Sequence, residues 1–246
     1  MNSKNPRFVP KGWALPETIV RRLGDEIGRQ RLMDEDGHLL VLLHAPPKSE
    51  HNEERHPAVF WRKPDGEWKS APESGGLLAL KALLSSYMDL ATELDLQAET
   101  ASAPRQFFRV IRELAPLHRS SRHLLEVMEE LRKARPEERE LILLRDEAVN
   151  VERAADMALV DARAGMDFVI AEAGQLQAQM AQQSAVEAQR LNRLAALFLP
   201  MATLAAIFGI NRPEDILRMP GLAALVGAGL VFGLFARLLI GRKPGG

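Results

Sequence analysis

The chain has 246 residues, 46% of them hydrophobic, and a formal net charge of −1 at pH 7. A near-neutral balance argues against a nucleic-acid-binding protein, which would carry a basic excess. Because the sequence contains no cysteine, a disulfide framework and a thiolate metal site are excluded. The charges are uneven, since residues 194–246 contain only two acids, Glu214 and Asp215, whereas residues 1–193 are charged throughout.

The N-terminal region, residues 1–75, carries the signals of a small antiparallel sheet. Residues 1–13 are polar and lack the apolar stretch of a secretory signal. Asp36-Gly37 precedes the apolar run 39–43, and Pro64-Asp65-Gly66 separates Phe60-Trp61 from Trp68. Such turn residues between apolar runs are typical of hairpins, so we expect three or four strands, with a polar loop over 46–57.

The next region, residues 76–193, has the pattern of long helices. We expect one helix over 77–96, a second from Pro104 to about Arg135, and a third that begins at Pro136. The third helix has an apolar seam at steps of three and four: Leu144, Ala148, Val151, Ala155, Ala158, Ala162, Met166, Val169, Ala173, Leu176 and Met180.

This third helix is expected to continue without a break into the next apolar segment. It would then have about 70 residues and a length of roughly 105 Å. A helix of that length cannot bury its seam alone, so it should pack against the two preceding helices and against copies of itself. The alternative is a bent pair of helices broken near Gly165 or Gly174, where each glycine weakens the helix by about 1 kcal/mol.

Two uncharged segments follow, seventeen residues over 194–210 and eighteen over 219–236. Each is close to the hydrocarbon thickness of a bilayer. We interpret them as a first transmembrane helix at 194–211, an extracytoplasmic loop at 212–218, a second transmembrane helix at 219–241 and a cytoplasmic tail at 242–246. The excess of Lys and Arg beside the outer ends of the pair predicts that both chain termini are cytoplasmic. The alternative is a pair of buried helices in a soluble core.

The end of the first apolar segment resembles the CorA family of divalent-cation transporters. The residues that carry the resemblance are Phe198-Leu199-Pro200, Ile207 and Phe208-Gly209-Ile210-Asn211. The family usually has Gly-Met-Asn at this place, and Ile210 replaces the methionine, as in divergent branches that include zinc-transporting ZntB-like relatives. The resemblance is specific over 190–243 and architectural over 76–190. It implies an α-helical membrane protein and homopentamer, with two C-terminal transmembrane helices, a long cytoplasmic stalk helix and a small N-terminal α+β region.

The resemblance also implies the site. Gly209, Ile210 and Asn211 would form the selectivity filter, where five asparagine carbonyls hold a hydrated Mg²⁺ through its water shell. The pore-lining residues would be Leu191, Ala195, Leu199, Ala202 and Ala206. A ring of Leu199 would be a hydrophobic constriction. Alternatively, Asn211 is a simple helix cap.

Two features beside this segment follow from the residues themselves. Pro200 leaves the carbonyl of Ala196 without its helical donor, and the Thr203 hydroxyl can bond the backbone of Leu199. Glu214 and Asp215 at the pore mouth would concentrate cations, unless they only pair with Arg212 and Arg218.

Other metal-binding candidates have plainer interpretations. His38, His44, His51 and His56 fall close together in the sequence, where zinc ligation competes with ordinary surface and hairpin positions. The helical acids can form Mg²⁺-sensing sites between subunits or a solvated face: Asp146, Glu152, Asp156, Asp161, Asp167 and Glu172.

We therefore predict a channel or transporter for divalent metal ions in the plasma membrane (the bacterial inner membrane), with Mg²⁺ favoured and Co²⁺, Ni²⁺ or Zn²⁺ as further cargoes. The expected partners are copies of the chain, the lipid bilayer and the metal ion, with no nucleic acid and no resident cofactor. The sequence has no nucleophile-base constellation and no nucleotide-binding loop, so we do not expect an enzyme. The alternative is a membrane-anchored oligomeric regulator or scaffold that does not conduct.

Overall fold

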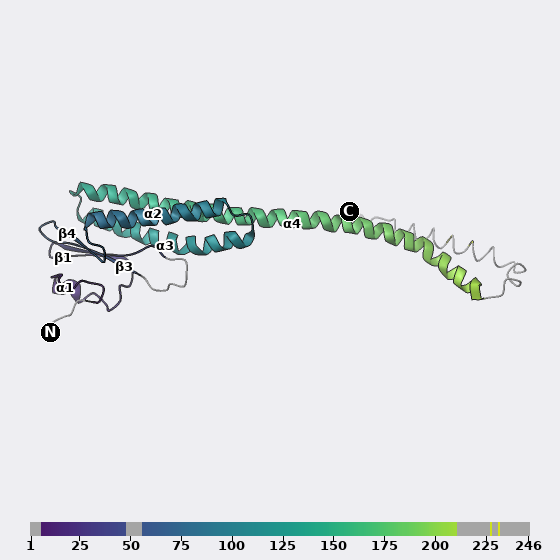
Figure 1. Ribbon diagram of the computed structural model, residues 1–246, viewed down its shortest axis with the longest axis horizontal. Coiled ribbons are helices and arrows are strands. Elements are labelled where there is room, and N and C mark those ends of the chain that lie inside the picture. The colour runs from purple at the N-terminus through teal and green to yellow at the C-terminus, as the bar shows by residue number, and fades with distance from the viewer. Residues whose placement is uncertain (1–5, 48–55, 211–226, 228–230, 232–246) are drawn as a thin grey trace, which may run out of the picture. The chain divides into compact units, whose positions relative to one another are not determined.

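The computed structural model describes residues 6–47 and 56–210, together with Gly227 and Val231 (Figure 1). The chain divides into two compact units, Met1–Ala171 and Glu172–Gly246. The described elements are α1 (Glu17–Val20), β1 (Arg31–Glu35), β2 (His38–His44), β3 (Pro57–Arg62), β4 (Trp68–Ala71), α2 (Leu77–Glu99), α3 (Pro104–Ala134) and α4 (Arg139–Ile210).

The four strands form one antiparallel sheet in the order β1-β2-β3-β4. Asp36 and Gly37 make the first turn with φ values of 52° and 78°, which is the conformation of a two-residue hairpin. Across this turn Glu35 pairs with His38, and across the second turn Arg62 pairs with Trp68. Both predicted hairpins are confirmed.

Both faces of the sheet are covered, which explains why the run Leu39–Leu43 is apolar without alternation. Leu39, Val41 and Leu43 pack into the core shared with the helices. Leu40 and Leu42 point the other way and pack with Ile19 of α1 and neighbouring N-terminal residues. Neither this N-terminal cover nor the short helix α1 within it was predicted from the sequence.

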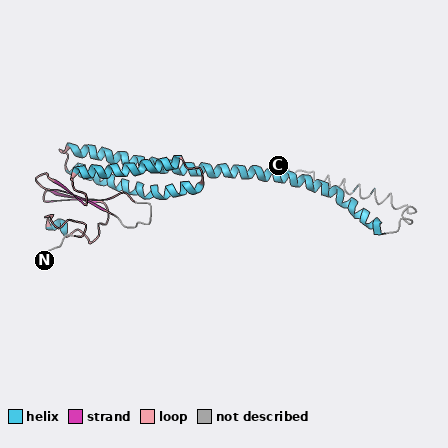
Figure 2. Ribbon diagram, viewed as in Figure 1, coloured by secondary structure: helices cyan, strands magenta, loops and turns pink. Residues whose placement is uncertain are grey.

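Helices α2 and α3 agree with the predicted helices to within a few residues, and they lie beside the first part of α4 (Figure 2). The third helix begins at Arg139 rather than at Pro136, because residues 136 and 137 form a turn. It then runs for 72 residues to Ile210. The single long helix is confirmed, and the alternative break near Gly165 or Gly174 is wrong.

The seam of α4 is buried only in its first part. Leu144 is 5% exposed, and Ala162 is fully buried. The seam positions between these two residues are buried as well. Farther along, Leu176 and Met180 are 54% and 57% exposed. Packing of the helix against the two preceding helices is therefore confirmed up to Ala162, and packing against copies of the chain stays a prediction.

Gly165 allows α4 to approach α3 closely. A Cβ atom added at Gly165 would lie 2.5 Å from Cε1 and 2.8 Å from Cζ of Phe107. A Cβ added at Gly174 would have no neighbour within 4 Å. The two glycines of one helix thus differ in whether they have room for a methyl group.

We expect Gly165→Ala to lower the free energy of unfolding by about 1–3 kcal/mol, because overpacking against Phe107 outweighs the better helix propensity of alanine. Gly174→Ala is the matched control and should raise that free energy by up to about 1 kcal/mol. Thermal and chemical denaturation of the purified full-length variants measures both. Stabilisation by both substitutions would show that the Phe107 ring moves aside at no cost.

Tyr87 joins three elements of the core. Its side chain, on α2, is fully buried, and its hydroxyl donates to the backbone oxygen of His44 at 3.1 Å. The same hydroxyl lies 2.6 Å from Oγ of Ser120 on α3. Gln30 Nε2, just before β1, donates to the backbone oxygen of Ser120 at 2.8 Å. Burial raises the pKa of Tyr87 to about 12, partly offset by the hydrogen bond with Ser120.

Tyr87 is the one tyrosine of the chain, so the tyrosinate absorbance reports this residue alone. We expect the pKa of Tyr87 to be about 12 in the folded protein and about 10 in the denatured chain. The raised pKa contributes stability that is fully present below about pH 10 and is lost as the pH rises through the folded pKa. A spectrophotometric titration with and without denaturant measures this. A native midpoint close to the denatured one would mean that water reaches the hydroxyl.

Candidate functional site

The predicted pore-lining residues lie on the C-terminal part of α4, with their side chains exposed. Leu191 and Leu199 are 67% and 69% exposed, and Ala195, Ala202 and Ala206 are exposed as well. Their spacing of three and four residues puts neighbours in the series on one side of the helix. Leu194 and Phe198 are exposed too, so exposure in the single chain does not select the side that faces a pore, and these assignments stay predictions.

Pro200 lies inside α4, which continues through it. The Thr203 side chain donates from Oγ1 to the backbone oxygen of Leu199 at 2.8 Å. This is the hydrogen bond predicted from the sequence, and it is confirmed. A threonine that is hydrogen-bonded to the preceding turn can bend a helix. Pro200 and Thr203, which both alter helix geometry, are therefore only three residues apart.

The predicted filter lies at the limit of the described chain. Gly209 and Ile210 are the last two residues of α4. Asn211, Glu214 and Asp215 lie outside the described residues, as do the loop 212–218, the tail 242–246 and, apart from Gly227 and Val231, the segment 219–241. The roles assigned to them stay predictions.

Residues 194–210 are helical, as the sequence predicts, and they belong to α4. Within the part of the chain that the structure describes, no helix is long and apolar enough to cross a membrane.

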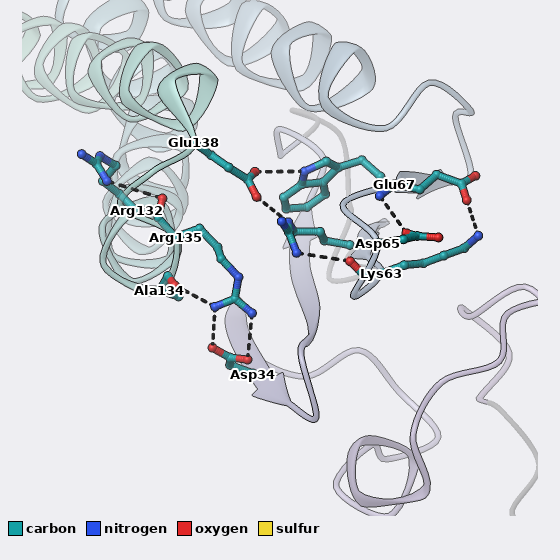
Figure 3. A network of polar contacts seen from close by, with 10 residues as sticks. Asp34, Lys63, Asp65, Glu67, Arg132, Ala134, Arg135 and Glu138 are labelled. Atoms are coloured by element: carbon teal, nitrogen blue, oxygen red, sulfur yellow. Dashed lines mark hydrogen bonds and ion pairs between the residues drawn. The ribbon is translucent and has the colours of Figure 1, made fainter.

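The start of α4 is fixed to the sheet by Glu138 (Figure 3). Its Oε1 accepts a hydrogen bond from Arg62 Nε on β3 at 2.5 Å, and its Oε2 accepts one from Trp68 Nε1 on β4 at 3.3 Å. The side chains of Arg62 and Glu138 are only 14% and 20% exposed. A charge-assisted pair in a partly buried setting is stronger than one on an open surface.

A second ion pair holds the same turn from the other side. Arg135, the residue after α3, donates to both carboxylate oxygens of Asp34 on β1 at 3.2 and 3.4 Å. Arg135 and Glu138 together form what we call the turn anchor. Because their partners are distant in the sequence, the acid-rich stretch after Pro136 indicated a helix start but not these contacts.

The second hairpin turn has its own polar contacts beside the turn anchor (Figure 3). Lys63 forms an ion pair with Glu67, and this hydrogen bond raises the pKa of Lys63. The Glu67 backbone N–H donates to Oδ1 of Asp65 at 3.0 Å. These contacts hold the Pro64-Asp65-Gly66 turn closed.

Two histidines of the sheet region, His38 and His44, have structural roles. His38 accepts a hydrogen bond from Trp61 Nε1 at Nδ1, at 3.1 Å, and stacks on that ring. His44 is buried at the end of β2. His51 lies outside the described residues. The hairpin interpretation therefore holds for His38 and His44.

Two of the helical acids lie close to a histidine. Glu152 Oε1 and Asp156 Oδ1 of α4 are 3.6 and 3.4 Å from Nε2 of His118 on α3. Asp146 pairs with Arg145 at 3.3 Å. Among the described residues, no group of three or more His, Asp or Glu side chains is arranged to hold a metal ion. A metal-sensing role for these acids stays a prediction that requires a second chain.

No family model matches the chain, and no curated protein matches its sequence. Among solved structures, that of the full-length CmaX protein has a TM-score of 0.59 at 16% identity, and the match covers 92% of this chain and 83% of CmaX. The crystal structure of the ZntB cytoplasmic domain from Vibrio parahaemolyticus has a TM-score of 0.39 at 15% identity, over 66% of this chain and 80% of that domain. The chain thus shares its fold with CmaX over most of its length.

Proposed function

We propose that the protein is a CorA-like channel or transporter for divalent metal ions. The observation that carries the proposal is the continuity of α4, which starts at the turn anchor and runs without a break to Gly209-Ile210. A helix of this kind brings the segment that resembles the CorA signature to the end of a long stalk. The fold shared with CmaX supports this architecture.

In the proposed architecture, residues 194–211 and 219–241 cross the plasma membrane, and both termini are cytoplasmic. The support is in the sequence, since the two segments contain seventeen and eighteen consecutive uncharged residues. Arg237, Arg242 and Lys243 at the outer end of the second segment agree with cytoplasmic termini.

The proposed assembly is a homopentamer. Among the described residues, the seam of α4 is buried as far as Ala162, whereas Leu176 and Met180 farther along are more than half exposed. Moving one such side chain from water into a packed interface stabilises the assembly by about 1.5–3 kcal/mol. Copies of the same helix are therefore the natural partners. Five copies of residues 191–206 would then line one pore.

Mg²⁺ is the proposed principal cargo. It gives up its water shell reluctantly, so a ring of neutral asparagine carbonyls suits recognition of the hydrated ion. Co²⁺, Ni²⁺ and Zn²⁺ are further proposed cargoes. The reason is that Ile210, beside Asn211, stands where the CorA signature usually has methionine.

Metal flux into liposomes that contain the purified full-length protein tests the proposal. We expect influx of Mg²⁺ above that of empty liposomes, with the other divalent ions tested in parallel. A correctly assembled protein that passes none of these ions would contradict transport, and would favour the non-conducting regulator or scaffold.

We expect Asn211→Ala to abolish selective uptake while the oligomer stays intact, because the substitution removes the carbonyl ring and little packing. Flux and mass in mild detergent measure the two properties on the same preparation. Uptake at the level of the unmodified protein would mean that Asn211 only caps the helix.

Leu199→Ser should raise divalent flux and make it less sensitive to internal Mg²⁺, because a smaller polar ring lowers the barrier to wetting. Leu199→Met is the matched control, since it keeps an apolar side chain of similar volume. Both variants are checked for assembly by mass. An assembled Leu199→Ser protein with unaltered flux would place the gate elsewhere.

A further inference from the structure

The outer faces of α2 and α3 carry opposite charge. Helix α2 contains four acids and one lysine, and the acids all lie in its C-terminal half. Asp89, Glu93 and Glu99 are exposed there, around Leu96, which is 59% exposed. We call these four residues the acidic face.

The first two thirds of α3 have the complementary composition. Residues 104–123 contain five arginines and one acid. Arg105, Arg109 and Arg112 are exposed around Phe108, which is 58% exposed. We call these four residues the arginine face. Each face is thus an exposed apolar side chain surrounded by charges of one sign.

The two faces do not neutralise each other within one chain. None of their six charged residues takes part in an ion pair among the described residues, whereas the one lysine of α2, Lys81, pairs with Glu147 of α4 at 3.6 Å. Glu93 receives only a neutral hydrogen bond, from Gln97 Nε2 at 3.2 Å. Both faces are therefore available to a partner.

The two faces also lie at the same height along the hairpin of α2 and α3. Residues 100–103 connect the helices, so positions equally distant from the connection lie at similar heights, at 1.5 Å per residue. Leu96 is four residues before the connection and Phe108 is five residues after it. A rotation about an axis parallel to the helices keeps every residue at its height, so it brings these two faces into register between neighbouring copies.

We propose that copies of the chain assemble head to tail, with the acidic face of one copy against the arginine face of the next. An interface between two different faces generates a closed ring when the rotation closes. The apolar centres, Leu96 and Phe108, contact each other, and the surrounding charges fix the register. The proposal rests on the self-association in the proposed function and adds the surface through which the cytoplasmic parts meet.

Cross-linking tests the contact directly, because the chain contains no cysteine of its own. The full-length protein carrying Leu96→Cys and Phe108→Cys is assembled in detergent and oxidised. We expect a ladder of disulfide-linked species beyond the dimer, because each chain links to two neighbours. Either single variant should give dimers at most, since one cysteine links one pair.

Charge reversal tests the pairing. In the double-cysteine background, Arg105→Glu, Arg109→Glu and Arg112→Glu together should reduce the ladder by about tenfold or more, because like charges then face each other. Adding Asp89→Lys, Glu93→Lys and Glu99→Lys to the same chain should restore it. The matched control is Glu129→Lys with Glu130→Lys, exposed positions near the other end of α3, which should leave the ladder unaltered.

The mass of the unoxidised protein separates this proposal from the proposed function. A pentamer without the ladder would overturn the head-to-tail contact and leave the assembly standing, whereas a monomer would overturn both. Loss of the ladder without rescue by the second reversal would overturn the pairing. Binding of the arginine face to vesicles of anionic lipid, with no ladder, would assign that face to a membrane surface instead.

Discussion

Among the described residues, the seam of helix α4 is buried as far as Ala162, and Gly165 makes a close contact with Phe107 just beyond it. Up to that point its small and branched seam residues are closed off from water by α2 and α3. Small side chains allow helices to approach closely, and close packing supplies most of the stability of a helix in a protein. The remaining 48 residues of α4, 163–210, continue the same helix.

The sheet holds the turn that precedes α4 in place. Both faces of the sheet are covered by other parts of the chain. Glu138 and Arg135 connect the turn to three of its four strands. Loss of one partner from a partly buried ion pair leaves the other charge without compensation, which costs more than the pair itself contributes. These contacts fix the start of α4 to the N-terminal sheet region.

Local patterns in the sequence were sufficient for the strands and the long helices, but not for α1 or for the contacts between elements. Asp36-Gly37 specifies its turn by backbone conformation alone, and the seam of α4 follows from a period of three and four residues. The partners of Glu138 are chosen by tertiary packing, which no local pattern encodes. For the same reason Gly165 was counted as a weak point of the helix, when the Phe107 ring requires it. The pore residues rest on a resemblance, and Asn211 lies outside the described residues.

The contact between Gly165 and Phe107 also fixes the axial register of α4 on α3. A slip of α4 by one turn is a translation of about 5.4 Å. It would bring Asp161 or Val169 to the place of Gly165, and both have side chains where the ring leaves room for a hydrogen atom only. Piston-like sliding of α4 along α3 is therefore blocked by sterics. A movement of this part of α4 relative to α3 would therefore have to be a tilt or a twist rather than a slide.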